Sequence, residues 1–254
     1  MASKELTAAL AAARAAAEVI NECYRHSPSV RLKPDASPVT EADLRAEEVI
    51  CATLAKSFPG YGFYGEETGR HAMEAENIWL VDPIDGTKSF VREMPFFSTQ
   101  IALMRAGELV LGVSNAPAYG ELAWAERGGG AYLNDQRIRV SAVATLQQAF
   151  LSTGNIKSLT QSPQWARLGA LLARVGRVRG YGDFVHYHLL ARGSLDVVIE
   201  SDVNIHDIAA LAVIVREAGG KFTDLDNREV GLTTTSVLAT NGLLHVALLE
   251  ALGS

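Results

Sequence analysis

The interpretation of this chain starts from one stretch, Trp79-Leu80-Val81-Asp82-Pro83-Ile84-Asp85-Gly86-Thr87. The apolar run that begins at Ile78 predicts a buried strand, and Asp-Pro-x-Asp-Gly predicts a turn at its end. Proline fixes the chain direction after Asp82, and Gly86 lets the backbone come close to a ligand. Two carboxylates on one rigid turn, beside backbone N–H groups and the Thr87 hydroxyl, suit a hard divalent cation that carries a phosphate.

An ordinary loop is the competing interpretation of the same residues. In that case the Asp82 side chain caps the backbone N–H of Gly86 or Thr87, and Asp85 faces water. An isolated Asp-x-x-Asp-Gly is more often such a loop than a site. Matching segments elsewhere in the chain are needed to favour a metal site.

The composition narrows the class of protein. A chain of 254 residues can build a large core, in one domain or in two closely packed halves. Its 48% hydrophobic and 20% charged residues are typical of a soluble globular protein. A net charge of -6 without a Lys/Arg run argues against nucleic acid, and no apolar run reaches the length of a membrane span. We therefore expect neither nucleic acid nor a membrane as a partner.

Cysteine usage and the N-terminus indicate the compartment. Cys23 and Cys51 lack C-x-x-C spacing, which favours two reduced thiols over a disulfide or a zinc site. The alanine-rich N-terminus is interrupted by Glu5, Arg14 and Glu18 and contains no long apolar segment of a signal peptide. The expected location is the cytoplasm.

The first half of the chain predicts two helices followed by a sheet. One helix is expected from residue 4 to about 26, with an apolar face of Leu6, Leu10, Ala13, Ala17 and Ile20. A second begins at Thr40-Glu41-Ala42-Asp43 and stops at Pro59-Gly60, with an apolar face of Leu44, Val49, Ile50 and Leu54. Strands are expected at Ile78–Val81, Ser98–Met104, Glu108–Ser114, Glu121–Glu126 and Arg137–Val140. This order predicts an antiparallel sheet with helices on one side.

The second half alternates strands and helices, which indicates α/β character. The expected strands are Phe150–Thr153, one near Val178, Asp196–Glu200 and Val237–Ala239. The expected helices are Ser162–Val175, Asp183–Ala191, Asp207–Ala218 and Leu243–Leu252. We place the two parts at residues 1–144 and 145–254. The run Gly128-Gly129-Gly130 lacks the Lys-Ser/Thr of a phosphate loop, and it predicts a hairpin connection.

Further carboxylates stand in separate segments, and each has a simple explanation alone. Asp207 stands at a helix start and alone is best explained as an N-cap, because its side chain would accept hydrogen bonds from helix N–H groups. Glu66 and Glu67 read as solvated loop charges. Asp43 lies in the first turn of a helix, where the macrodipole favours an acid.

Taken together, these segments resemble the inositol monophosphatase superfamily in order and approximate spacing over nearly the whole chain. The matching motifs are Val39-Thr40-x-x-Asp43, Gly65-Glu66-Glu67, Trp79-x-x-Asp82-Pro83-Ile84-Asp85-Gly86-Thr87, and Asp207-Ile208-Ala209-Ala210 with Glu217-Ala218-Gly219-Gly220. The resemblance implies alternating α-β-α-β-α layers, with an antiparallel N-terminal sheet and a mixed C-terminal sheet. It also implies magnesium-dependent hydrolysis of a small phosphomonoester, and a homodimer.

The resemblance also assigns roles to residues of this chain. As ligands of two to three Mg²⁺ ions it implies Glu66, Asp82, the Ile84 carbonyl, Asp85 and Asp207, with Asp82 bridging two ions. Gly86 and Thr87 would offer N–H groups to the phosphate. Thr87 and Asp43 would orient the attacking water, and Glu67 would support the ligands. These roles make Glu66, Asp43, Thr87 and Asp82 the candidate catalytic residues.

Elementary chemistry agrees with those roles. A phosphomonoester is dianionic and repels an anionic nucleophile, and clustered carboxylates are unfavourable unless cations neutralise them. Magnesium ions offset both problems and activate water, so no protein nucleophile is required. A covalent route would need an activated nucleophile with a positioned base, and we find no such arrangement in the sequence.

The substrate is suggested by the segment Arg179-Gly180-Tyr181-Gly182-Asp183-Phe184 and by the tail Ala239-Thr240-Asn241-Gly242. Both look most like the histidinol-phosphate phosphatase branch. Asp183 stands where inositol-specific members have a small neutral residue, and Glu200 matches a position that contacts substrate hydroxyls. Two acids there would suit a cationic ester. Arg179 would reach the phosphate or align Asp183, while an N-cap is the competing role for Asp183.

Alternatives remain beside L-histidinol phosphate. One is a polyol or sugar phosphate such as myo-inositol 1-phosphate, and another is a regulatory role through protein binding. Asp207 would also face the substrate. His206 replaces the family's usual Trp. The paired His186 and His188 point apart on a helix, which indicates packing or surface positions and not a metal site.

Overall fold

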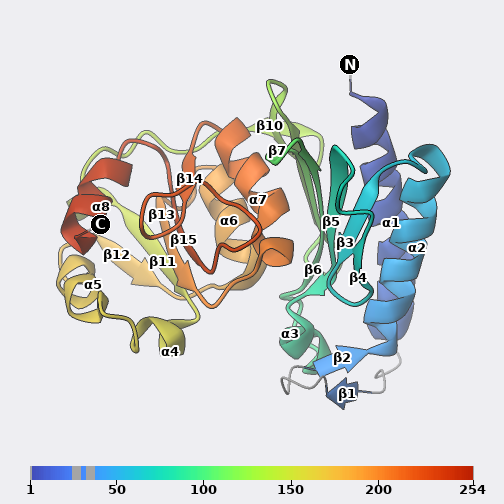
Figure 1. Ribbon diagram of the computed structural model, residues 1–254. Helices are drawn as coiled ribbons and strands as arrows, with labels where there is room; N and C mark the ends of the chain where they lie inside the picture. Colours follow the sequence, from blue (N-terminus) through green and yellow to red (C-terminus); the bar gives the residue numbers. More distant parts are fainter. Residues whose placement is uncertain (1, 25–29, 33–37, 254) are drawn as a thin grey trace.

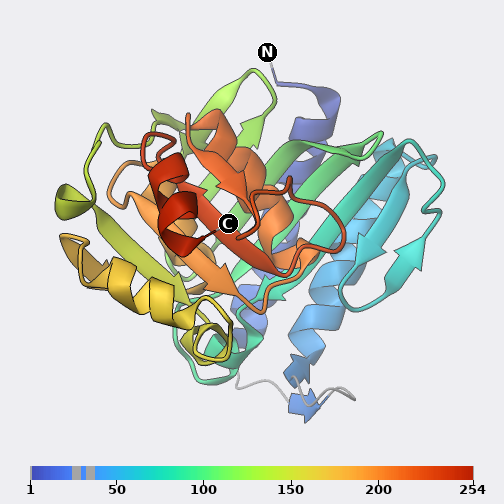
Figure 2. The ribbon, with the colours of Figure 1, turned by 60° about the vertical axis from the view of Figure 1, so that its left-hand side comes forward.

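The computed structural model describes residues 2–24, 30–32 and 38–253. Its elements stack as five layers, helices–sheet–helices–sheet–helices, as Figure 1 shows from right to left. Figure 2 turns the C-terminal sheet to the front, with the longer N-terminal sheet behind it. The expected layered α/β fold is confirmed.

The first outer layer is formed by α1 (Lys4–Tyr24) and α2 (Glu41–Ser57), which pack on each other and on the first sheet. α1 buries small residues such as Ala9 and Ala16, so the helices approach closely, while the expected core residues Leu10 and Ala17 are only half-buried. The predicted end near residue 26 lies outside the described residues. The expected face of α2 was wrong at Leu44, which is 46% exposed.

The N-terminal sheet has eight strands in the order β10-β9-β8-β7-β6-β5-β3-β4. The pairing is antiparallel throughout, apart from one parallel pair, β3 with β5. The β8–β9 turn at Gly128-Gly129-Gly130 is the expected hairpin, and Glu217 accepts from two of its N–H groups. In chain order the strands are β3 (Gly62–Gly65), β4 (Gly69–His71), β5 (Asn77–Asp85), β6 (Ser98–Arg105), β7 (Glu108–Ala116), β8 (Glu121–Glu126), β9 (Gly130–Leu133) and β10 (Gln136–Ile138).

The middle layer consists of α6 (Asp183–Ala191) and α7 (Ile205–Glu217). Ten of the thirteen residues of α7 are buried, because a sheet covers it on each side. Gly112 of β7 lies directly against the backbone of Ala210, where a Cβ would collide with the Ala210 carbonyl. This absence of a side chain lets α7 sit on the N-terminal sheet, which positions the start of α7 beside the end of β5.

The C-terminal sheet has the order β12-β11-β13-β15-β14 and is mixed, as expected. β11 pairs in parallel with both of its neighbours, and β15 pairs antiparallel with β13 and β14. Its strands are β11 (Phe150–Gly154), β12 (Arg177–Arg179), β13 (Val197–Ser201), β14 (Lys221–Thr223) and β15 (Ser236–Thr240). The outer layer contains α4 (Ile156–Leu159), α5 (Trp165–Leu172) and α8 (His245–Leu252).

Smaller elements complete the chain. β1 (Val30–Leu32) pairs with β2 (Pro38–Thr40), α3 (Thr87–Val91) follows β5, and a 3-10 turn covers Leu146–Gln148. The change from one sheet to the other falls between β10 and β11, and one apolar cluster joins both sheets through α6 and α7. Whether residues 1–144 and 145–254 act as separate domains stays a prediction. Within the described ranges, no helix is long and apolar enough to cross a membrane.

Candidate active site

The site begins where β5 meets β6. β5 continues through Pro83 to Asp85, further than the sequence predicted, and its register against β6 shifts between Asp82 and Asp85. The Asp82 carboxylate accepts from the Ile84 backbone N–H at 2.9 Å, not from Gly86 or Thr87 as the loop interpretation expected. Such an irregularity re-aims side chains, and here it brings two aspartates to the same side.

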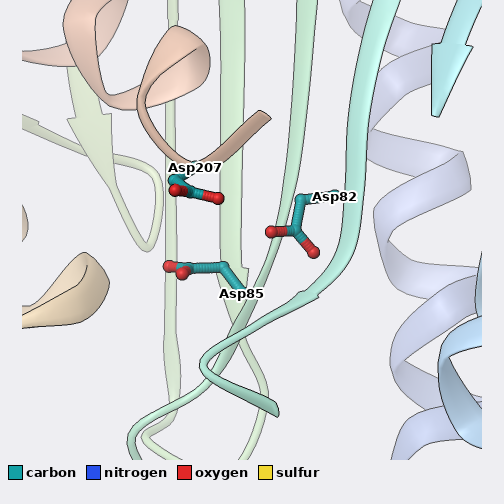
Figure 3. Close-up of side chains that lie close together, drawn as sticks. All are labelled: Asp82, Asp85 and Asp207. Atoms are coloured by element: carbon teal, nitrogen blue, oxygen red, sulfur yellow. The ribbon is translucent and has the colours of Figure 1, made fainter. Parts of the chain in front are cut away.

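Three carboxylates from two distant segments, the end of β5 and the start of α7, meet at this point. Oxygens of Asp82, Asp85 and Asp207 all lie within 4.8 Å of one another. Figure 3 shows that Asp82 and Asp85 extend from the end of β5 toward Asp207 at the start of α7. Residues 125 positions apart in sequence (82 and 207) therefore form one acidic cluster.

The cluster is electrostatically unfavourable by itself. Burial raises the pKa of Asp82 well above its ordinary value, and the carboxylates of Glu66 and Asp85 raise it further. Burial likewise raises the pKa of Asp207 to about 7, although the Asn204 backbone N–H opposes the shift. Oxygen ligands of this number and charge match what Mg²⁺ prefers. The donor set thus fits a hard divalent cation, which would remove the repulsion.

Glu66 follows the end of β3, and its backbone N–H donates to the Val81 carbonyl at 3.0 Å. The Glu66 carboxylate lines the same cavity as the cluster. Its loop is held by Glu47 of α2, whose fully buried carboxylate accepts from the backbone N–H groups of Glu67 and Thr68 at 2.9 and 2.7 Å. Sequence analysis missed Glu47.

Asp43 and Thr87 face each other beside the cluster. Thr87 Oγ1 lies 2.9 Å from the Ile84 carbonyl oxygen and 3.3 Å from Asp43 Oδ1. Asp43 is fully buried, and Thr40 donates to its Oδ2 through both the backbone and the hydroxyl. Burial raises the pKa of Asp43, while the bonds from Thr40 oppose that rise.

Gly86 turns the chain from β5 into α3. Its φ of 89° is left-handed, and a Cβ would lie 2.5 Å from the Phe96 carbonyl oxygen, so only glycine fits. The first N–H groups of a helix have no acceptor within the helix, and Gly86, Thr87 and Lys88 at the start of α3 line the cavity. Lys88 is the exposed cation there, and sequence analysis had not singled it out.

The cavity measures about 230 Å³ and continues from the cluster to a second group of acids. This second group consists of Asp183, Glu200 and Asp202, which line the same cavity. Gly182, not Asp183, occupies the N-cap of α6, so the N-cap role for Asp183 was wrong. Asp183 has a left-handed φ of 47°, a strained geometry for a residue with a side chain. Burial and the charge of Glu200 raise its pKa to about 6.

Two other predicted positions lie differently from expectation. Arg179 is exposed, lines a neighbouring pocket with Tyr181, and donates to the Val178 carbonyl, so the structure does not bring it to the acidic cluster. Asp207 is not an N-cap: Asn204 caps α7, and Asp207 accepts back from the Asn204 backbone N–H at 2.8 Å.

His206, which directly precedes Asp207, is buried. Its ring meets Tyr64 edge-on at 4.2 Å between centroids, and its Nδ1 lies 3.0 Å from Asn204 Oδ1. The side chain therefore packs behind the cap that orients Asp207.

A layered α/β fold thus brings carboxylates from both halves of the chain around one small cavity, and this donor set is suited to divalent cations beside a phosphate. Comparison with known families then places the chain: residues 1–254 match the model of the inositol monophosphatase family, and the chain belongs to that family. It is a phosphoric monoester hydrolase by class, as expected.

The named relatives include histidinol-phosphatases and inositol-1-monophosphatases. The chain is 42% identical to the histidinol-phosphatase of Mycobacterium tuberculosis over 87% of each sequence. It is 38% identical to an inositol-1-monophosphatase of Mesorhizobium japonicum over 87% of this chain and 85% of the relative. The crystal structure of the extragenic suppressor protein suhB from Bartonella henselae superposes with a TM-score of 0.90 at 34% identity, over 98% of each chain.

Proposed function

We propose that this chain hydrolyses L-histidinol phosphate to L-histidinol and phosphate with the help of magnesium. The observation that carries the proposal is the meeting of Asp82, Asp85 and Asp207 beside a cavity with a second acidic side. The similarity to histidinol-phosphatases, at 42% and 40% identity, supports this choice of ester.

The proposed metal site holds two to three Mg²⁺ ions through oxygen ligands, namely Glu66, Asp82, the Ile84 carbonyl, Asp85 and Asp207. Bound there, Mg²⁺ would neutralise the phosphate and make a water molecule nucleophilic. Seven carboxylates and one lysine ammonium line the cavity in the described part of the chain. A dianionic ester would be repelled from such a surface without added cations.

The chain's own groups orient the phosphate and the water. The backbone N–H groups of Gly86 and Thr87 face the phosphate, with the Lys88 ammonium at the rim. The Thr87 hydroxyl orients the water and passes a proton to Asp43 Oδ1, which lies 3.3 Å away. The raised pKa of Asp43 makes it a stronger base than an ordinary aspartate, which suits this role.

Asp183 and Glu200 recognise the leaving group, with Asp207 between them and the phosphate. Both acids line the cavity, and after burial the repulsion between them is the next cause of the raised pKa of Asp183. A cationic ammonium or imidazolium would relieve that repulsion, whereas a neutral polyol would not.

Phosphate release from a panel of phosphomonoesters tests this function. With Mg²⁺, kcat/KM for L-histidinol phosphate should exceed that for myo-inositol 1-phosphate by at least about tenfold, because only the cationic ester can form a charge-assisted hydrogen bond with Asp183 and Glu200. Without Mg²⁺, turnover of both esters should vanish. Equal or better use of the inositol ester would assign the chain to polyol phosphates. No turnover of any ester would favour a regulatory protein-binding role.

Two variants separate the metal site from recognition. Asp82→Asn should lose nearly all Mg²⁺-dependent hydrolysis while the circular dichroism spectrum stays native, and normal turnover would refute the metal assignment. Asp183→Ala should raise KM for L-histidinol phosphate selectively. An equal effect on the inositol ester would remove the basis for the substrate. The homodimer stays a prediction that light scattering of the same samples can check.

A further inference from the structure

Glu200 is connected to a buried hydrogen-bond chain that the catalytic roles do not use. His186 of α6 is fully buried, and its Nε2 lies 3.1 Å from Glu200 Oε2. The hydroxyl of Tyr187 donates to the same oxygen at 2.6 Å. On the other side of the ring, His186 Nδ1 lies 3.3 Å from Ser152 Oγ.

The donor and the acceptor in each of these hydrogen bonds can be assigned from the groups that carry a proton. The backbone N–H of Tyr181 donates to Ser152 Oγ at 3.0 Å, so that oxygen acts as an acceptor there. Ser152 is fully buried, and among the described contacts His186 Nδ1 is the acceptor within reach of its hydroxyl proton. A neutral ring that accepts at Nδ1 carries its proton on Nε2 and donates it to Glu200.

The Glu200 carboxylate is thereby held in a fixed orientation. Its Oε2 receives two donors, an arrangement that an ionised carboxylate satisfies. Its Oε1 lies over Gly154, the neighbouring residue on β11, where a Cβ would collide with that oxygen. The side chain is 6% exposed and lines the cavity, so little of its charge is screened by water.

We propose that His186 is a positioning residue, which, backed by Ser152, holds Glu200 as the anion that recognises a positively charged leaving group. This inference rests on the proposed function and adds the origin of its selectivity. The same series of hydrogen bonds connects Glu200, through His186 and Ser152, to the backbone N–H of Tyr181, two residues before Asp183. The two acids that face the leaving group therefore share one support.

A matched control stands on the same helix. His188 is also fully buried between a carboxylate and a serine, with Nδ1 2.9 Å from Glu121 and Nε2 2.9 Å from Ser114. It faces the N-terminal sheet, and its partner Glu121 pairs with Arg192 at 2.7 Å. Replacement of either histidine removes a buried ring with the same kinds of partner, but only one ring contacts Glu200.

The test compares His186→Leu, His186→Gln and His188→Leu with Mg²⁺ present. His186→Leu should raise KM for L-histidinol phosphate about tenfold and change kcat/KM for myo-inositol 1-phosphate less than about threefold, since one buried charge contact is weakened. His186→Gln, whose amide can still donate, should recover part of the loss. His188→Leu should alter neither ratio. Equal losses on both esters in His186→Leu would overturn the inference.

A second readout does not depend on catalysis. Nitrogen-15 spectra of the wild-type protein should show His186 protonated at Nε2 and bare at Nδ1, with the Nε2 signal shifted in Glu200→Gln. A proton on Nδ1 would overturn the assignment even if the leucine variant failed to fold. The double variant His186→Leu/Glu200→Gln should be no less selective than Glu200→Gln alone, because His186 acts through Glu200.

The two proposals fail in distinguishable ways. A wild-type enzyme that does not prefer the cationic ester refutes the proposed substrate, whatever the spectra show. A wild-type enzyme that prefers it, combined with unchanged KM in His186→Leu, refutes the role of His186 and leaves the proposed function intact.

Discussion

The N-terminal turns of α2 and α7 share one capping motif but have different neighbours in the fold. Each helix has a capping box: Thr40 and Asp43 at α2, Asn204 and Asp207 at α7. In both, the aspartate of the third helical position accepts from the backbone N–H of the cap residue, at 2.7 and 2.8 Å. Both aspartates also border the same site.

The difference lies in the second oxygen of each carboxylate. Asp43 Oδ1 lies beside the Thr87 hydroxyl. It is not part of the acidic cluster found among the described residues. Asp207 instead brings an oxygen within 4.8 Å of Asp82 and Asp85. In the proposed mechanism, a common local motif therefore provides a proton-accepting group at Asp43 and an ion ligand at Asp207. The neighbours contributed by the fold decide between them.

The largest expected effect separates these two aspartates by metal affinity. Asp207→Asn should lower kcat by about a thousandfold or more and abolish the rise in melting temperature that Mg²⁺ gives the wild type. Asp43→Asn should lower kcat by about a hundredfold, as expected for a group that handles a proton, and keep that thermal shift. Differential scanning fluorimetry with phosphate-release kinetics measures both. Loss of the Mg²⁺ shift in Asp43→Asn would break the comparison.

A smaller effect concerns pH and the metal-free protein. The pKa of Asp207 is raised to about 7, against about 4 in an unfolded chain. The protonated carboxyl thus stabilises the fold below pH 4, and this contribution is lost as the pH rises to 7. Metal-free Asp207→Asn should melt a few degrees above the metal-free wild type at pH 8, with the gap closing toward pH 4. A constant gap across that range would contradict the raised pKa.

The smallest effect concerns the caps themselves. Thr40→Ala and Asn204→Ala should each lower the free energy of unfolding by about 1 kcal/mol, because each removes a side-chain acceptor from a helix start. Only Thr40→Ala should also lower kcat at saturating Mg²⁺, since the Thr40 hydroxyl donates to Asp43 Oδ2 at 2.6 Å. Urea titrations and kinetics on the two variants provide the comparison. An equal kcat in both would remove the role of that hydroxyl.

The long elements with clear periodicity could be predicted from the sequence. β8 (Glu121–Glu126) and α6 (Asp183–Ala191) have the expected bounds, and β6, β7 and α7 differ by a few residues at their ends. Short strands were missed: β3 contains two glycines in four residues, which hides a strand pattern until its neighbours are known.

The face of α2 shows why the site could be predicted only in part. Apolar spacing favoured an inward Leu44, but the inner face carries the fully buried carboxylates of Asp43 and Glu47. Their i, i+4 spacing was the signal that places both on one face. Family motifs supplied Asp43, whereas Glu47 needed the structure. The contact of His186 with Ser152 and Glu200 depends on the parallel pairing of β11 with β13, which no local pattern contains.

The contact between Gly112 and Ala210 fixes how close α7 lies to the N-terminal sheet. Because β7 contacts the backbone of α7 at this point, a larger residue at position 112 would push α7 away from β7 and would move Asp207 with it. The spacing of the three aspartates is thus set in part by a backbone contact at Ala210, about one helical turn along α7 from Asp207. If residues 1–144 and 145–254 were produced as two fragments, the proposed Mg²⁺ site would form only after Gly112 had packed against Ala210. Mg²⁺ binding would therefore report docking of the two fragments.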